Sequence, residues 1–423
     1  MNSLICQAGI LVTRYKKYFQ SSFLYLFASF FSAVIGIAIN PLMAKNLSPH
    51  DYAILGYFSS FGSIFLPISN FSLISYYLRN YFKISEQRKQ IVSDTILIAL
   101  LCYGFIVLII AVACFYFYVQ WAEVSFPFYP YVLLTLGPIY LNNFVTLYQV
   151  NCRVKRKADK YAQIVIFGTI LSTFFAILLV VIYKYGAPGR FLALLMSSLI
   201  MSIYCFKQLF VKLQFDFSVI KDAVKFGWPL SLSAVLWYFL TDVDRAMLEK
   251  LNDSYTFGFY NVGLQLAAYF GVFYVAIGNT FEPDIYKAIA ENNKRRVAKI
   301  SGLILILNAV PNLVFIVFAT TIIRVLTYNR YTDASVFAQI LALKNITVAF
   351  YYEAITILIG YGFTKSELMI RVIGALMCII MFKLLISHYG FYGAAWGQVF
   401  SFILMSGISI SYLFFLFMKK KLA

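Results

Sequence analysis

Long apolar stretches, separated by short polar segments, recur along the whole chain. Each runs for roughly 18 residues or more, which is enough for an α-helix to cross about 30 Å of hydrocarbon. Twelve of them are predicted as transmembrane helices: 18–39, 53–78, 92–119, 128–150, 161–182, 189–210, 226–248, 257–280, 300–321, 334–359, 367–386 and 391–418. The polar segments between them are too short to hold a soluble domain. The pattern therefore predicts an all-α, polytopic membrane protein.

Composition and charge agree with this class and orient the chain. Of the 423 residues, 62% are hydrophobic and only 12% are charged. With the N-terminus placed inside, 26 of the 35 Lys and Arg residues fall on one side of the membrane and 8 on the other, with Lys344 inside a span. This asymmetry follows the positive-inside rule and predicts that both termini are cytoplasmic. We therefore expect the excess basic charge, +18 in total, to contact anionic lipid rather than nucleic acid.

We expect no cleavable signal in the N-terminal segment. Its apolar run, Leu4 to Val12, is short and is followed by Arg14, Lys16 and Lys17. This order predicts an amphipathic segment that lies on the membrane surface.

Cysteine and histidine are too scattered for a metal or redox site. The six cysteines show no CxxC pairing, and His50 and His388 fall in separate outer loops. Cysteines inside predicted spans pack as small apolar residues. We therefore expect no metal and no cofactor.

The twelve spans divide into two halves of six. The cytoplasmic segment 211–225 separates a predicted lobe 1–210 from a predicted lobe 226–423. A faint repeat agrees with this division, because "NPLMAKNLSPHDYAILGYF" after the first span is similar to "DRAMLEKLNDSYTFGFYNVG" after the seventh. Each has a helix end, a Leu, a polar turn and an aromatic helix. Such repeats are typical of transporters in which two lobes surround a central cavity.

The segment "FDFSVIKDAVKFGWPLSLSAVLWYFLTDVDRAMLEKL", with "GFYNVG" a few residues later, resembles the polysaccharide exporter family. These are the Wzx-type flippases of lipid-linked oligosaccharides, within the multidrug/oligosaccharidyl-lipid/polysaccharide superfamily. "NPLMAKNLSPHDYAILGYF" and "YGFYGAAWGQVFSF" are similar to the family's first outer turn and last span. Glu249 stands where Gly is common, and "ISNFSL" at 68–73 lacks the usual Asp-x-Gly character. The resemblance implies secondary transport.

A charged cluster closes the seventh span, in "LWYFLTDVDRAMLEKLN" at 236–252. Its Asp-x-Asp pattern, Asp242 and Asp244, is typical of nucleotide-sugar enzymes, but such a site must face the cytoplasm and the charge count puts it outside. Asp242, Arg245 and Glu249 share one helix face, which predicts an ion network at the interface with a snorkelling Arg245. The alternative is that Arg245 lines the outer mouth of a cavity and contacts an anionic substrate.

Lys344 lies about ten residues into the span 334–359, too deep to reach the surface easily. A charge at mid-membrane costs about 2.5–3.5 kcal/mol on insertion scales, so such residues usually face a cavity. Thr347 and Tyr351 continue its helix face. One interpretation is an interhelical ion pair; the other, which we favour, is a cation that binds substrate. Glu353 lies near the opposite side of the helix.

The remaining intramembrane charges complete the predicted site. Arg371 and Lys383 in the span 367–386, and Arg79 at the inner end of 53–78, are either cations of the cavity or snorkelling side chains. Asp242, Asp244 and Glu353 are the acids that would carry a coupling proton or ion.

The function expected from these features is that of a flippase. A lipid-linked oligosaccharide carries an apolar tail, an anionic diphosphate and many hydroxyls, and each polar group left unsatisfied in hydrocarbon costs several kcal/mol. A cationic cavity would hold the diphosphate by charge-assisted hydrogen bonds. We therefore expect translocation of an undecaprenyl-diphosphate-linked oligosaccharide, such as an O-antigen unit, by alternating access. The chain has no Walker A motif, and we expect no enzymatic activity.

Two other classes stay open. A multidrug or ion antiporter of the same superfamily would have an acidic and apolar cavity. A membrane polysaccharide polymerase would have a large outer loop with clustered Arg and His. The expected partners are the lipid-linked oligosaccharide, membrane lipids, and a polysaccharide polymerase with its chain-length machinery, in a bacterial inner membrane.

The charge asymmetry predicts the topology directly. In a cysteine-free background, Arg156→Cys and Lys294→Cys should react with an impermeant thiol reagent only after the inner face is exposed, because both lie in basic segments. His50→Cys and Asp253→Cys should react in intact cells. Labelling of position 156 in intact cells would reverse the orientation and restore the Asp-x-Asp interpretation.

Overall fold

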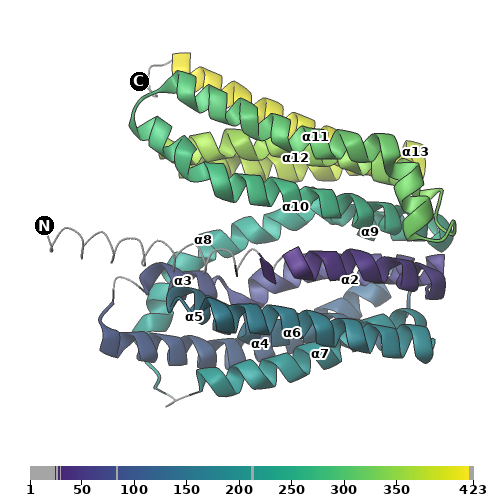
Figure 1. Cartoon of the computed structure of the whole chain (residues 1–423), viewed down its shortest axis with the longest axis horizontal. Helices are drawn as coiled ribbons and strands as arrows, with labels where there is room; N and C mark the ends of the chain where they lie inside the picture. The colour runs from purple at the N-terminus through teal and green to yellow at the C-terminus, as the bar shows by residue number, and fades with distance from the viewer. Residues whose placement is uncertain (1–23, 25–26, 29, 82–83, 211–213, 419–423) are drawn as a thin grey trace, which may run out of the picture. The chain divides into compact units, whose positions relative to one another are not determined.

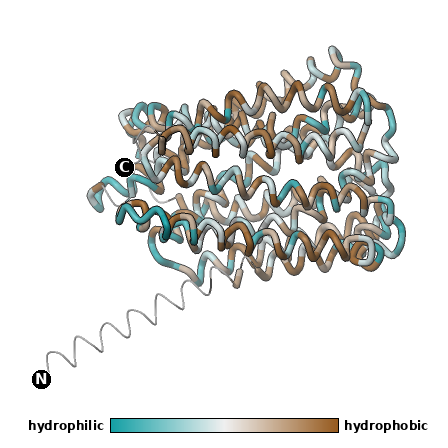
Figure 2. Tube along the Cα trace, turned by 90° about the horizontal axis from the view of Figure 1, so that it is seen from above, coloured by the Kyte–Doolittle hydropathy of each residue, from teal (hydrophilic) through white to brown (hydrophobic). Residues whose placement is uncertain are grey.

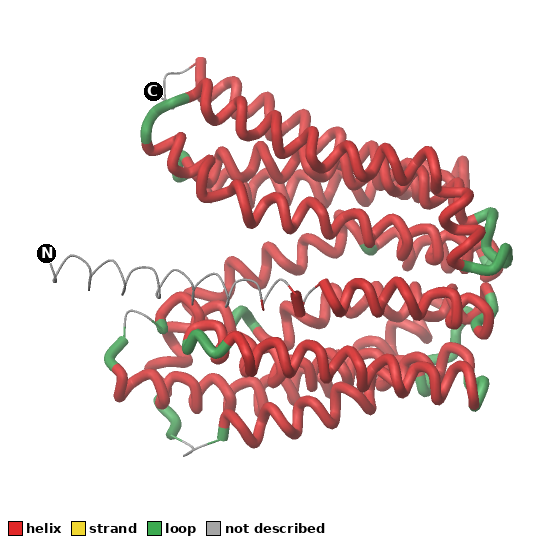
Figure 3. Tube along the Cα trace, in the orientation of Figure 1, coloured by secondary structure: helices red, strands yellow, loops and turns green. Residues whose placement is uncertain are grey.

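Helices make up almost the whole of the described chain. The computed structural model describes residues 24, 27–28, 30–81, 84–210 and 214–418, and within these ranges no strand occurs (Figure 3). The all-α prediction is confirmed. The predicted surface segment 4–12 and the start of the first predicted span lie outside the described residues.

Fourteen helical elements follow one another after the helix Phe30–Asn46 (Figure 1). They are α2 (Pro49–Asn70), α3 (Leu73–Asn80), α4 (Glu86–Ala122), α5 (Tyr131–Val154), α6 (Ala158–Ala176), the π-helix η1 (Ile177–Ile182), α7 (Gly186–Leu209), α8 (Phe217–Thr241), α9 (Val243–Leu248), the 3-10 turn η2 (Glu249–Leu251), α10 (Ser254–Ala290), α11 (Lys294–Leu326), α12 (Ala334–Gly360) and α13 (Thr364–Met418). Gly390, with φ 55°, divides α13 into two helices.

Many of these helices have the length and composition of membrane spans. In the described part of the chain, eight are long and apolar enough to cross a bilayer: α2, α4, α6 with η1, α7, α8, α11, α12 and α13. Hydrophobic residues run along the helices and hydrophilic residues gather mainly at their ends (Figure 2). The chain is a multi-pass membrane protein.

Two predicted spans are not continuous helices. The span predicted over 53–78 breaks at Phe71 and Ser72, whose φ angles are 43° and 54°. The Asn70 side chain accepts a hydrogen bond from the Ser72 amide at 3.0 Å, a local bond that competes with the helical one. The span predicted over 226–248 breaks at Asp242, where φ is −130°. Hydropathy predicts the length of a span and does not register breaks of one or two residues within it.

The chain forms two compact units. Unit 1 comprises Met1–Asn46, Phe65–Ala122 and Pro127–Ser231, and unit 2 comprises Leu47–Ile64, Glu123–Phe126 and Leu232–Ala423. The division therefore falls inside α2 and inside α8 rather than in the segment 211–225. The predicted lobes 1–210 and 226–423 stay a prediction.

The segment that precedes α8 is fixed to unit 1. Residues 211–213 of the predicted linker lie outside the described part. The Asp216 amide donates to the Thr95 hydroxyl at 3.0 Å, and the Asp216 carboxylate accepts from the amide and hydroxyl of Ser218 at 2.8 and 2.6 Å. These Ser218 hydrogen bonds hold the pKa of Asp216 below its usual range. The second part of the predicted linker, residues 217–225, therefore forms the beginning of α8.

Each unit is built around one helix with several neighbours. In unit 1, α7 packs against α5 and α6, and Ser32 bonds to Thr169 on α6 at 2.6 Å. In unit 2, α12 packs against α10, α11 and α13. In unit 2, α10 approaches α2 closely because residue 258 is a glycine. A Cβ added to Gly258 would lie 2.1 Å from the Pro49 carbonyl oxygen.

Substituting Gly258 tests this packing. Gly258→Ala should lower the melting temperature of the purified protein, because overpacking costs about 1–3 kcal/mol. Gly302→Ala is the matched control, since no atom lies within 4 Å of a Cβ at that helical glycine. The control should match or exceed the wild-type melting temperature. Equal stability of the two variants would show that α2 and α10 have room to separate.

Candidate functional site

A cavity of about 410 Å³, lined by both polar and apolar residues, lies within unit 2. Its volume falls in the range of small-ligand sites. Four helical segments supply its walls: α2, the end of α8 with α9, α10 and α12. The lining residues are Tyr52, Leu55, Gly56, Ser59, Thr241, Asp242, Arg245, Asn261, Leu264, Gln265, Ala268 and Lys344.

Lys344 is the cation that α12 contributes to this cavity. Its ammonium lies 6.0 Å from the centre of the Phe402 ring. Among the described residues it takes part in no ion pair, so an interhelical pair does not account for it. The placement favours the interpretation of Lys344 as a cavity cation. Thr347 and Tyr351, which were expected to extend this face, do not line the cavity: the Thr347 carbonyl accepts from Ser406 on α13 at 3.1 Å.

Asparagine side chains fix the helix that carries Lys344. The Asn345 amide donates to the Ala267 carbonyl at 2.9 Å and to Asn312 Oδ1 at 3.0 Å. Asn308 in turn donates to the Asn345 carbonyl at 3.2 Å. Because these bonds join α12 to α10 and α11, they set the rotation of α12 about its axis. That rotation turns the neighbouring Lys344 into the cavity.

Arg245 and Asp242 form an ion pair in the same cavity. Their side chains are only 11% and 14% exposed. Arg245 also donates to the Thr241 carbonyl at 3.3 Å. Of the two cations that line the cavity, Arg245 contacts both Asp242 and the buried Asp244, whereas Lys344 has no ion-pair partner among the described residues. A cation in a low-dielectric wall attracts anions.

Asp244 and Glu249 serve other contacts. Asp244 is fully buried, accepts a hydrogen bond from the Tyr260 hydroxyl and lies 3.8 Å from Arg245 Nε. Glu249 accepts from the Ser125 amide at 2.6 Å. The predicted pairing of Asp242 with Arg245 is confirmed, whereas Glu249 is not part of that pair. The reason is local: α9 ends at Leu248, and the following 3-10 turn points Glu249 elsewhere.

The other predicted cations and the third predicted acid do not line this cavity. Arg371 pairs with Glu367 at 2.5 Å and lies 5.7 Å from the Trp237 ring. Lys383 is exposed on α13. Arg79 belongs to unit 1, where it stacks 4.7 Å from the Phe226 ring. Glu353 is buried, and its Oε1 has no hydrogen-bond partner among the described residues.

Several uncharged lining residues were not predicted as site residues. Asn261 and Gln265 lie one turn apart on α10, and Ser59 comes from α2. A Cβ on Gly56 would lie 2.0 Å from the Asn261 side chain, so this glycine makes room for it. The spacing of Asn261 and Gln265 indicates a polar face on α10, but no sequence pattern connects that face with Lys344.

Comparison with known proteins gives a family and a fold. The family model described as "Polysaccharide biosynthesis protein" matches residues 18–283. No curated protein matches the chain in sequence.

Solved structures match over nearly the whole chain. An inward-facing multidrug resistance MATE family transporter of the MOP superfamily has a TM-score of 0.73 at 15% identity, covering 91% of this chain and 93% of its own. The lipid II flippase MurJ, in an inward closed conformation, has a TM-score of 0.71 at 18% identity, covering 94% and 87%. A mutant of the Vibrio cholerae MATE transporter VcmN has a TM-score of 0.57 at 14% identity, covering 96% and 98%. The chain therefore shares the fold of these transporters.

The buried hydrogen bond from Tyr260 to Asp244 should contribute to stability. Tyr260→Phe removes the donor and leaves a buried carboxylate oxygen unsatisfied, which costs about 1.5–3 kcal/mol. We expect a lower melting temperature for this variant. Tyr255→Phe is the matched control, because Tyr255 is 61% exposed on the same helix. A Tyr260→Phe protein as stable as the control would show that Arg245 alone satisfies Asp244.

Proposed function

This chain belongs to the polysaccharide biosynthesis protein family, and on that premise we propose that it is a flippase for a lipid-linked oligosaccharide. The proposed substrate is an undecaprenyl-diphosphate-linked repeat unit, such as an O-antigen unit. The chain moves it from the cytoplasmic to the outer leaflet of a bacterial inner membrane. MurJ, which has the same fold, carries the name of a lipid II flippase.

Lys344 is the observation that carries this proposal. It is a cation inside a membrane span, it lines a cavity, and it has no ion-pair partner in the described part of the chain. Placing a cation there is costly, and an anionic ligand offsets the cost. A diphosphate is such a ligand.

The uncharged part of the cavity wall suits a saccharide. Ser59, Asn261 and Gln265 offer hydroxyl and amide groups that both donate and accept hydrogen bonds. In a multidrug or ion antiporter we would expect an acid available to a cation. Here the lining acid, Asp242, is paired with Arg245.

The remaining roles extend the same proposal. Two lobes alternate access around a central cavity, with both termini cytoplasmic and without ATP hydrolysis or covalent chemistry by this chain. Arg79, Arg371 and Lys383 would meet the substrate along its path. Asp242, Asp244 and Glu353 are the groups proposed to carry a coupling proton or ion. A polysaccharide polymerase and its chain-length machinery would take the product.

Substitution of Lys344 tests the proposed function. Lys344→Ala should reduce glycan export per inserted molecule at least about tenfold, the effect of one lost charge-assisted hydrogen bond. Lys344→Arg should retain part of the activity, because the charge survives while the geometry changes. Lys344→Glu should be the least active, since it repels phosphate in a low-dielectric wall. Export and membrane abundance are measured together.

Lys299→Ala is the matched control, because Lys299 is an exposed cation on α11 that does not line the cavity of Lys344 and has no proposed role on the substrate path. It should export at the wild-type level. A structural role for Lys344 gives a different pattern, in which Ala lowers abundance but leaves export per molecule unchanged. Wild-type export by Lys344→Ala would refute its role in binding substrate.

A further inference from the structure

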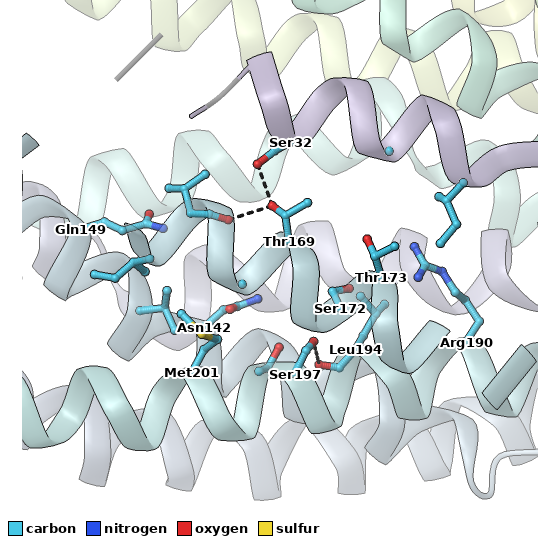
Figure 4. A pocket seen from close by; sticks show the side chains of 17 residues that line it. Ser32, Asn142, Gln149, Thr169, Ser172, Thr173, Arg190, Leu194, Ser197 and Met201 are labelled. Atoms are coloured by element: carbon cyan, nitrogen blue, oxygen red, sulfur yellow. Dashed lines mark hydrogen bonds between the residues drawn. The ribbon is translucent and has the colours of Figure 1, made fainter. Parts of the chain in front are cut away.

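Unit 1 contains a second polar cavity, of about 370 Å³ (Figure 4). Its polar side chains are hydroxyls, amides and one guanidinium, and none of the described residues that line it is acidic. They are Ser32, Asn142, Gln149, Thr169, Ser172, Thr173, Arg190, Ser197 and Ser198. This inventory suits a ligand with many hydroxyls and a negative charge.

Three helices contribute polar side chains to this cavity, with Val145 and Leu194 among them on α5 and α7. Asn142 and Gln149 are seven residues apart on α5, and Thr169 and Thr173 are four apart on α6. Arg190 begins a face of α7 that continues through Ser197. The amides of Asn142 and Gln149 have no hydrogen-bond partner among the described residues, so both are available to a ligand.

An apolar groove of about 730 Å³ adjoins the polar cavity. It is formed largely by the outward faces of α6 and α7, with Phe167 and Ile170 on α6 and Ile200 and Tyr204 on α7. These four side chains are 54%, 48%, 41% and 49% exposed, as expected for a surface that faces lipid. The groove can therefore receive an apolar chain directly from the bilayer.

The two spaces share part of their walls. Ile164 and Met201 line both the polar cavity and the apolar groove. At this junction Gly168 on α6 faces Met201 on α7. A Cβ added to Gly168 would lie 3.7 Å from Met201, which is an ordinary van der Waals distance. The junction connects a polar interior with a lipid-facing surface, which is the requirement for binding an amphiphile.

We propose that unit 1 binds one lipid-linked saccharide, with its prenyl chain in the α6–α7 groove and its sugar head in the polar cavity. This inference rests on the proposed function. It adds a second binding site and states in which space each end of the ligand lies. The head enters past Ile164 and Met201, and its hydroxyls bond to the amides and hydroxyls of the three helices.

The position of Arg190 identifies one chemical group of the head. Arg190 and Met201 are eleven residues apart on α7, or about 16 Å along the helix axis. In this complex, which is distinct from the one in which Lys344 binds the diphosphate, the diphosphate adjoins the prenyl chain and would therefore lie at the Met201 end. The anion that meets Arg190 then belongs to a sugar, and a carboxylate suits the planar guanidinium. The proposed head is a saccharide with an acidic sugar distal to the diphosphate.

Binding of defined probes to the full-length protein in nanodiscs tests the site. The probes are a prenyl-diphosphate-linked disaccharide that ends in glucuronic acid, the same compound ending in glucose, prenyl diphosphate alone, and phosphatidylglycerol. Native mass spectrometry or equilibrium titration gives each affinity. The wild type should bind the acidic disaccharide about ten-fold or more tightly than the neutral one, the effect of one charge-assisted bond.

Three variants separate the parts of the site. Arg190→Gln should remove the preference for the acidic disaccharide and leave the neutral one unchanged. Gly36→Leu fills open space in the polar cavity and should weaken both disaccharides but not prenyl diphosphate. Gly168→Leu obstructs the junction and should weaken all three prenyl probes about ten-fold. Gly302→Leu, a helical glycine with open space in unit 2, is the control.

Two results would overturn the inference. One is an unchanged acidic preference in Arg190→Gln together with unchanged binding in Gly36→Leu. The other is phosphatidylglycerol binding as tightly as the acidic disaccharide, which would make the groove an ordinary lipid contact. Failure of the proposed function is distinguishable, because it appears as absent translocation of every prenyl-linked saccharide by the wild-type protein, whatever the binding results.

Discussion

The hydrocarbon of a bilayer offers no hydrogen bonds, and this constraint decides where the polar side chains of the protein lie. A polar group that faces lipid loses several kcal/mol, so it must bond to the protein or face a water-filled space. Both solutions occur in unit 2. Asn312 and Asn345 bond to each other and hold three helices together, and Tyr260 bonds to Asp244. Lys344 instead lines a cavity. The structural network and the site are therefore two outcomes of one rule.

Much of the fold could be predicted from hydropathy because the same constraint acts on the backbone. Each span must satisfy its own amides, which makes apolar length a dependable signal for a helix. The breaks at Ser72 and Asp242 escaped that signal. The first depends on the left-handed Phe71 and Ser72 and on the Asn70 side chain that bonds to the Ser72 amide. At the second, the Thr241 hydroxyl bonds to the Asp242 carboxylate. The break at Gly390 was predictable, because Gly390 lies between two apolar runs that are each long enough to form a span.

Only one residue of the site could be predicted from its own position in the sequence, because a charge in the middle of a span cannot face lipid. Lys344 is conspicuous because it is a charge at mid-span, and the structure places it in a cavity. Arg371 looked similar in sequence, yet it is paired with Glu367 four residues earlier. Helical periodicity gives the face of a residue but not the neighbour opposite that face. Asn261 was missed for this reason, because its place depends on space that Gly56 provides on another helix.

Each unit thus carries its own cavity, and the charges of the two follow different arrangements. In unit 2 the lining cations are accompanied by Asp242, which neutralises one of them. In unit 1 the described lining has Arg190 and no acid, and the remaining polar groups are neutral. A wall of neutral donors and acceptors binds hydroxyls without a large desolvation cost, whereas a wall of charges binds ions. The wall in unit 1 therefore suits the hydroxyls of a saccharide, and Lys344 in unit 2 suits an anion.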